Sequence, residues 1–159
     1  MSADPARHTA SRTLVPAIWY RWLLLAVWIL MIFGLSMVLT PDWIRRFLSL
    51  LVYGSSTAIE SRFSNAANAY VTLVHGVLGA VMFGWGLSML LALRGPFRRG
   101  EAIGWQLIAL PLVAWFVPDT AFSLYTGFWQ NAVLNTGFAL LFAVPLIATR
   151  RVFLQGHQG

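Results

Sequence analysis

The sequence predicts an all-α integral membrane protein, with four transmembrane helices in an up-down bundle and a short interfacial amphipathic helix between the first two spans. Three observations support this fold class. Of the residues, 58% are hydrophobic and only 10% are charged, with a mean hydropathy of +0.71, far from the balance of a soluble domain. Four apolar runs approach or exceed the length of about 20 residues that a helix needs to cross a hydrocarbon core. Finally, the arginines flank these runs.

The first part of the chain combines a polar tail with an apolar run. With 159 residues, the chain accommodates a single transmembrane domain, 1–159, and no separate soluble domain. Residues 1–16 lack an apolar period, so we expect a disordered cytoplasmic tail. The first span covers residues 18–39 and contains one charge, Arg21, beside aromatic residues that place it where its side chain can reach water.

A second, shorter helix is predicted directly after the first span. Thr40 is a suitable N-cap and Pro41 a suitable first residue for a helix over 41–53. Apolar residues share one face of this segment and arginines the other, which is typical of a helix lying in the membrane interface. A short helix packed over the end of the bundle is the alternative. Gly54 is expected to end the helix.

The second span, 66–93, is predicted to be the centre of the bundle because small or polar residues recur along it every four positions. These residues are Asn68, Thr72, Gly76, Ala80, Gly84, Ser88 and Ala92. In lipid, small residues let helix backbones approach closely and polar residues bond across helices. Gly79 and Gly86 offer a second close-approach side, which predicts self-association or a partner subunit. Alternatively, all of these glycines serve crossings within the chain.

The third and fourth spans are predicted at 102–125 and 131–149. A helix that ended before Pro118 would be too short to cross the membrane at about 1.5 Å per residue, so we expect it to continue past this proline. Asp119 then lies near the outer boundary of the membrane. Pro111 and Pro145 are further expected bends.

The distribution of arginines predicts the orientation. One side of the membrane would carry eight, namely Arg7, Arg12, Arg21, Arg94, Arg98, Arg99, Arg150 and Arg151, and the other would carry three, Arg45, Arg46 and Arg62. Because positive residues favour the cytoplasmic side, both termini are predicted to be cytoplasmic. Arginine is the only basic residue besides histidine, which suggests a GC-rich bacterial genome and therefore a bacterial inner membrane.

The two halves of the chain have features in common that suggest an internal duplication. Aligning Asn68 with Asn131 places small residues of the fourth span on those of the second. In addition, the odd-numbered spans each end in a Pro-Asp pair, at 41–42 and 118–119. The predicted arrangement is a parallel repeat about an axis along the membrane normal.

Polar side chains inside the membrane are the candidate functional residues, because they are costly there and usually face the bundle interior. Six are predicted to cluster in the outer half of the membrane: His75, Asp119, Asn68, Thr72, Asn131 and Asn135. One hypothesis is a polar pocket in which His75 and Asp119 form a proton-sensitive or ligand-orienting pair. The alternative is a hydrogen-bond network that only stabilises packing.

Several function classes are excluded or disfavoured. Cysteine is absent, which excludes disulfides, thiolate metal sites and cysteine catalysis. No metal-ligand spacing or catalytic motif occurs, so an enzyme is disfavoured and no cofactor is implied, although a pigment with His75 as its single axial ligand stays open. The positive charge is explained by the membrane, so nucleic acid is not expected as a partner.

Two functions stay open. The first is a scaffold or accessory subunit that sits in the lipid bilayer and packs against other membrane helices as a homo-oligomer or with another subunit. The second is a binder or transporter of a small or lipid-like ligand, such as a quinone, lipid or pigment, around His75 and Asp119.

Overall fold

The computed structural model describes residues 15–57 and 61–154, and the part of the chain that it describes is helical with short connections. Residues 1–14, and with them most of the expected N-terminal tail, lie outside this part. Within residues 15–57 and 61–154, four helices are long and apolar enough to cross a membrane. The elements are α1 (Ala17–Leu39), α2 (Pro41–Tyr53), α4 (Asn65–Ala92), the π-helical turn η1 (Leu93–Phe97), α5 (Ala102–Tyr125) and α6 (Trp129–Leu154).

The helix bounds agree closely with those predicted from the sequence. Helix α2 covers the predicted residues, and α5 continues through Pro118 as expected. Helix α6 differs because it runs five residues beyond Thr149, to Leu154. The extension places Phe153 against Phe97 of η1, with ring centroids 4.8 Å apart, so tertiary packing stabilises turns that the apolar run alone did not predict.

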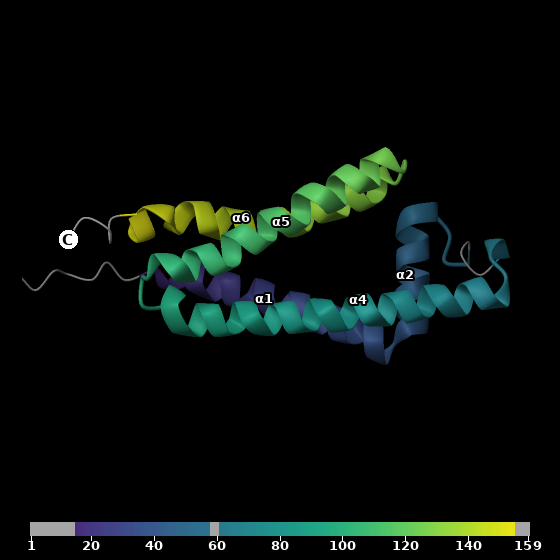
Figure 1. The fold of residues 1–159 in the computed structure, drawn as a ribbon, viewed down its shortest axis with the longest axis horizontal. Helices are drawn as coiled ribbons and strands as arrows, with labels where there is room; N and C mark the ends of the chain where they lie inside the picture. Colours follow the sequence, from purple (N-terminus) through teal and green to yellow (C-terminus); the bar gives the residue numbers. More distant parts are fainter. Residues whose placement is uncertain (1–14, 58–60, 155–159) are drawn as a thin grey trace, which may run out of the picture.

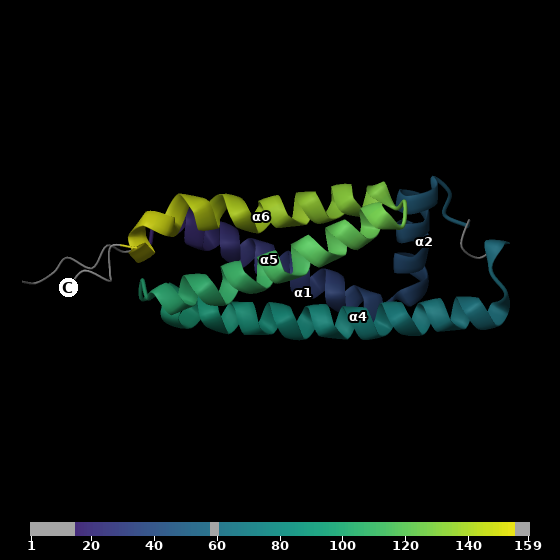
Figure 2. The ribbon, with the colours of Figure 1, turned by 45° about the horizontal axis from the view of Figure 1, so that its top comes forward.

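The four long helices lie along the long axis of the molecule, and α2 lies across it at one end (Figures 1 and 2). Helix α1 packs against both α4 and α6, while α5 packs against α6 and meets α4 more sparsely. Helix α1 thus makes the larger contact between the two pairs and α4 the smaller one, so the second span shares the central position with α1. The start of α1, the turn η1 and the end of α6 share the end opposite α2.

The crossing of α1 and α4 is the most extensive helix contact in the described part of the chain, and it is a close one. A Cβ atom on Gly34 would lie 2.7 Å from the carbonyl oxygen of Gly79, and one on Gly86 would lie 2.5 Å from the Met31 side chain. Gly79 and Gly86 thus serve a crossing within the chain, and the expectation that they are free for a partner is wrong. In contrast, an added Cβ at Gly76 or Gly84 would meet nothing within 4 Å. Ala80, Gly84 and Ser88 face outward.

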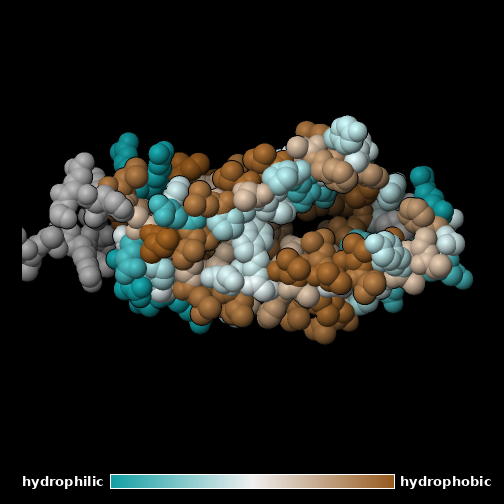
Figure 3. All heavy atoms as spheres, viewed as in Figure 1, coloured by the Kyte–Doolittle hydropathy of each residue, from teal (hydrophilic) through white to brown (hydrophobic). Residues whose placement is uncertain are grey.

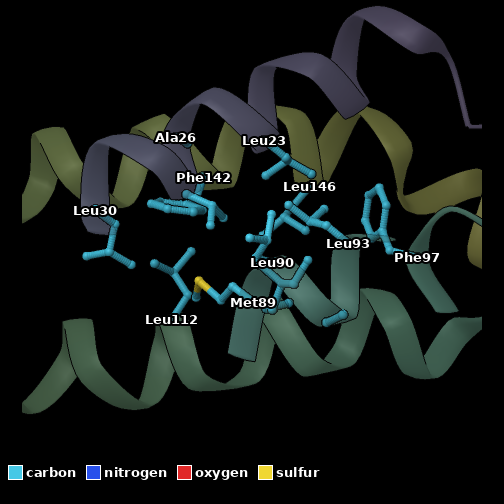
Figure 4. Close-up of a cluster of buried hydrophobic side chains, with 14 of the residues drawn as sticks. Leu23, Ala26, Leu30, Met89, Leu90, Leu93, Phe97, Leu112, Phe142 and Leu146 are labelled. Carbon is cyan, nitrogen blue, oxygen red and sulfur yellow. The ribbon is translucent and has the colours of Figure 1, made fainter. Parts of the chain in front are cut away.

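A cluster of buried apolar side chains fills the bundle at the end opposite α2 (Figure 4). Its members come from all four long helices and η1; among them are Leu23, Leu30, Met89, Leu93, Phe97, Leu112, Phe142 and Leu146. This cluster holds the two helix pairs together. The end of the bundle near α2 has no comparable cluster of buried apolar side chains among the described residues.

Helix α2 begins and ends at the predicted residues, but Thr40 does not cap it with its side chain. The Thr40 hydroxyl instead donates to the carbonyl of Ser36, 2.8 Å away in the preceding helix. Gly54 ends α2 in a left-handed conformation with φ of 71°, as expected. Ile44 is buried against the bundle, whereas Trp43 is exposed and stacks on the likewise exposed Phe47. Helix α2 therefore covers the end of the bundle and presents apolar side chains outward.

The structure does not reproduce the Pro-Asp correspondence on which the predicted duplication partly rests. Pro41 is the first residue of a separate helix, whereas Pro118 lies inside α5. The aligned asparagines also differ in their contacts. The side-chain amide of Asn68 donates to the Phe63 carbonyl, and that of Asn131 donates to Asp119.

Candidate functional site

A cavity of about 660 Å³ lies between the α1–α4 pair and the α5–α6 pair, near α2. Figure 3 shows a hollow between α4 and the α5–α6 pair on the face viewed there. The walls are mostly apolar and aromatic. Side chains from α1, α2, α4, α5 and α6 contribute, together with two residues of the turn between α5 and α6: Leu30, Phe33, Met37, Leu48, Val52, Tyr53, His75, Leu78, Val81, Met82, Trp85, Trp115, Asp119, Phe122, Ser123, Thr126, Phe128, Asn131, Leu134, Asn135 and Phe138.

The divergence of α5 from α4 leaves this space unfilled. Trp85 of α4 and Trp115 of α5 are neighbours, with ring centroids 5.9 Å apart, and both line the cavity. Towards α2, α5 leans away from α4 in both ribbon views (Figures 1 and 2). Because α5 contains Pro111 and Pro118, it lacks two backbone N–H donors, and loss of these helical hydrogen bonds favours bending.

A hydrogen-bonded group of Asp119, Ser123 and Asn131 lies on the α5–α6 side of the cavity. The Asn131 side-chain amide donates to Asp119 Oδ1 at 3.2 Å and to Ser123 Oγ at 2.8 Å. Ser123 Oγ lies 2.7 Å from the Asp119 carbonyl oxygen, to which it donates. The turn between the helices makes this possible, because Gly127 adopts φ of 83° and α6 returns alongside α5.

Two further polar side chains that line the cavity each have a buried nitrogen without a hydrogen-bond partner among the described residues. Asn135 is only 5% exposed, and its Nδ2 is buried and has no acceptor. His75 contributes a buried Nδ1 that likewise has no partner. A buried polar group that lacks a partner costs free energy, so such groups mark places where a ligand or water can bind.

The structure brings together four of the six polar residues predicted to cluster. His75, Asp119, Asn131 and Asn135 line the cavity. Asn68 and Thr72 do not: Thr72 Oγ1 donates to the Asn68 carbonyl within α4, and the Asn68 amide donates to a residue just before the helix. The inclusion of Asn68 and Thr72 in the pocket is therefore wrong.

The expected direct interaction between His75 and Asp119 is not found among the described residues. Both side chains line the cavity, but within the described residues Asp119 bonds to Ser123 and Asn131 rather than to His75. Local geometry explains this outcome. Ser123 lies four residues after Asp119 on one face of α5, and the short turn after α5 brings Asn131 to the same level.

Sequence reasoning did not identify Ser123 or the aromatic walls of the cavity. The spacing of Asp119 and Ser123 was a usable signal, because residues four apart on a helix are neighbours. The aromatic walls had no such signal. Trp85 and Trp115 are far apart in the sequence, and only the packing of α4 and α5 brings them to one cavity.

The charge within the cavity is one-sided. Asp119 is the carboxylate among the lining residues, and these described residues include no arginine or lysine. The cavity therefore combines apolar walls, one carboxylate and several neutral polar groups.

Compared with known proteins, the chain matches no protein-family model, and no curated protein or solved structure has significant similarity to it.

Proposed function

We propose that this protein binds a small lipid-like molecule in the cavity between its two helix pairs. The cavity itself is the observation that carries the proposal. Its volume of about 660 Å³ falls within the range of small-molecule sites, roughly 300–1,000 Å³, which are typically apolar with a few polar groups that orient the ligand. A quinone, a lipid or a pigment belongs to this class of occupant.

The bilayer is the source of the occupant in this proposal. The cavity walls on α4 and α5 include Leu78 and Phe122, which are 49% and 66% exposed along the sides of helices that can cross a membrane. An apolar molecule in the hydrocarbon region can therefore reach the space between α4 and α5 sideways. Such entry needs no aqueous path, because the apolar part of the ligand stays in contact with lipid or protein throughout.

The proposed location is the outer half of a bacterial inner membrane. Among the described residues, six arginines lie at the end that carries η1 and three near α2: Arg21, Arg94, Arg98, Arg99, Arg150 and Arg151 against Arg45, Arg46 and Arg62. If the end with more arginines is cytoplasmic, both termini are cytoplasmic and the cavity opens near the outer leaflet.

A matched pair of tryptophan substitutions tests whether the cavity binds a ligand. Leu134→Trp fills the cavity, while Leu140→Trp makes the same change on an exposed part of α6 that does not line it. The wild type and both variants are purified in dodecyl maltoside and examined by native mass spectrometry, by mass spectrometry of an organic extract, and by absorption spectroscopy for a pigment. We expect a retained molecule in the wild type and in Leu140→Trp, and its loss in Leu134→Trp.

The result that contradicts the proposal is equal retention in both variants, or no retained molecule in any of them. As a second test, any molecule identified in the extract is added back and thermal unfolding is followed. His75→Ala and Asp119→Asn are expected to fold but to lose stabilisation by that molecule. If both variants instead unfold at a lower temperature but are stabilised by the molecule as much as the wild type is, the two residues act only in packing.

A second candidate function, an accessory subunit or homo-oligomer, is favoured by the outer surface of α4. Ala80, Gly84 and Ser88 are exposed there, and an added Cβ at Gly84 would meet nothing. Small residues on a lipid-facing surface permit close approach of another helix. Gly84→Leu is expected to leave the monomer folded and to abolish self-association in crosslinking or co-purification of a partner subunit. Retained association in this variant would contradict the hypothesis.

A further inference from the structure

The hydrogen-bonding groups that remain unused in the cavity indicate the chemistry of the ligand's polar end. On the α5 side, Asp119 Oδ1 receives bonds from Asn131 and Ser123, and no donor among the described residues reaches Oδ2. On the α6 side, the buried Nδ2 of Asn135 has no acceptor. Besides the unpaired Nδ1 of His75 on α4, the cavity wall therefore presents an available acceptor on α5 and an available donor on α6.

These two groups lie on neighbouring helices, about one helical turn apart in level. Asn131 bonds to Asp119 at 3.2 Å, and Asn135 follows Asn131 by four residues on the same helix. Residues at this spacing have Cβ atoms about 5–6 Å apart. Asn135 thus lies one helical turn from the level of Asp119, and an atom between the two levels can bond to both.

The charge and the hydrogen-bonding groups of the lining disfavour three kinds of polar end. An anionic group such as a phosphate would lie beside Asp119 with no arginine or lysine among the described lining residues to compensate it. A cation would be attracted to Asp119 but would leave the Asn135 N–H without an acceptor. A ketone or ether accepts from Asn135 but donates nothing to Asp119.

From this combination we propose that the ligand of the cavity is an uncharged amphiphile whose polar end is a hydroxyl group. A hydroxyl donates one hydrogen bond and accepts others, so its O–H bonds to Asp119 Oδ2 while its oxygen accepts from Asn135 Nδ2. The aromatic walls around Trp85 and Trp115 hold the apolar part. The inference rests on the proposed function and specifies the class as isoprenoid alcohols, quinols or diacylglycerols.

Four probes that share one apolar chain test this inference. Geranylgeraniol, its methyl ether, its monophosphate and geranylgeranylamine differ only in the polar end. Binding to the full-length protein in dodecyl maltoside is measured by isothermal titration calorimetry, with 1,2-dioctanoylglycerol to compare an acyl with an isoprenoid chain. We expect the alcohol to bind at least about tenfold more tightly than the ether, because the ether cannot donate a hydrogen bond to the Asp119 carboxylate. The monophosphate and the amine are expected to bind more weakly than the alcohol.

Asn135→Leu separates recognition from a structural role. The variant removes a donor that has no partner within the described chain, so thermal stability of the ligand-free protein is expected to rise while the preference for alcohol over ether falls. Thr136→Val is the matched control on α6, because Thr136 bonds to the Ala132 carbonyl and does not line the cavity. The control is expected to keep the full preference.

The outcomes distinguish the two proposals. If the ether binds as tightly as the alcohol, or if the monophosphate or the amine binds most tightly, the cavity binds ligands but the hydroxyl inference is overturned. If none of the five probes binds and the purified protein retains no molecule, the proposed function fails as well. Unchanged discrimination in Asn135→Leu overturns the assignment of Asn135 as the donor.

Discussion

Gly79 and Gly84 lie five residues apart on α4, and their surroundings differ completely. Gly79 lies where the backbones of α1 and α4 touch, whereas Gly84 faces outward with nothing within 4 Å of an added Cβ. Glycine in a helix costs roughly 0.5–1 kcal/mol relative to alanine. Close approach offsets this cost at Gly79, and no contact within the chain offsets it at Gly84.

The two glycines therefore predict opposite effects of the same substitution. Gly84→Ala is expected to raise the free energy of unfolding by about 0.5–1 kcal/mol. Gly79→Ala is expected to lower it, because the new methyl group would press on the Gly34 backbone and the Met37 side chain. Unfolding is followed by tryptophan fluorescence in mixed dodecyl maltoside and SDS micelles. Stabilisation by both substitutions would contradict the observed crossing.

Asn131 and Asn135 form a second contrasting pair, one turn apart on α6. Asn131 donates to Asp119 and Ser123, while Asn135 has no partner for its Nδ2 among the described residues. We expect Asn131→Leu to lower the free energy of unfolding by about 1–2 kcal/mol, since it leaves the Asp119 carboxylate with fewer donors. Asn135→Leu is expected to raise it. The same micelle unfolding assay compares both variants, and destabilisation by Asn135→Leu in the ligand-free protein would contradict this reading.

At the scale of elements, a tryptophan in one helix supplies a hydrogen bond that a proline removes from another helix. Pro145 has no N–H, so the carbonyl of Leu141 in the preceding turn of α6 loses its helical donor. The indole N–H of Trp22 in α1 donates to this carbonyl at 2.9 Å. The bond links α1 to α6 at a carbonyl that has no hydrogen-bond donor within α6. In lipid, where water is absent, a backbone carbonyl needs such a donor from the protein.

This arrangement predicts coupling between Trp22 and Pro145. Trp22→Phe is expected to destabilise the wild type by about 1 kcal/mol, because the Leu141 carbonyl then has no donor. In a Pro145→Ala background the helix supplies its own donor to that carbonyl, so the effect of Trp22→Phe should shrink. A double-mutant cycle of the free energy of unfolding measures the coupling. Equal effects of Trp22→Phe in both backgrounds would exclude it.

At the scale of the whole molecule, the two ends of the bundle differ in packing. One end is filled by the buried apolar cluster, and the other contains the cavity beneath α2. In lipid, apolar side chains gain little by leaving the hydrocarbon for the protein interior, so an incompletely packed end is tolerated more readily than in a soluble core. The filled end can hold the helices together while the other end binds a ligand.

The orientation of this asymmetric molecule is directly testable. The chain has no cysteine, so single cysteines are unambiguous reporters. A membrane-impermeant maleimide applied to intact cells or spheroplasts is expected to label Ser56→Cys and Gln130→Cys but not Ser11→Cys or His157→Cys. Permeabilised cells serve as the control for reactivity at all four positions. The opposite pattern would reverse the proposed topology and place the cavity in the inner leaflet.

The sequence alone determined the four long helices, their approximate bounds and the crosswise helix between the first two. Each of these follows from local properties, because a membrane helix satisfies its backbone hydrogen bonds within itself and depends mainly on the length of an apolar run. The stop at Gly54 and the continuation through Pro118 were predictable for the same reason. Four of the six candidate polar residues also line the cavity, because polar groups in membrane helices face inward.

Only the tertiary structure decided which helix faces meet, that α1 makes the larger contact between the two pairs, and that Asp119 bonds to Asn131 rather than to His75. Small residues occur on two sides of α4, and nothing in the sequence distinguishes the side at Gly79 that touches α1 from the side at Gly84 that does not. In a soluble helix an apolar stripe would mark the inward face. In a membrane helix both faces are apolar, so the packed side is determined by the shape of the neighbouring helix. The prolines of α5 predict a bend, but only the tertiary structure shows that α5 leans away from α4 and leaves the cavity between them.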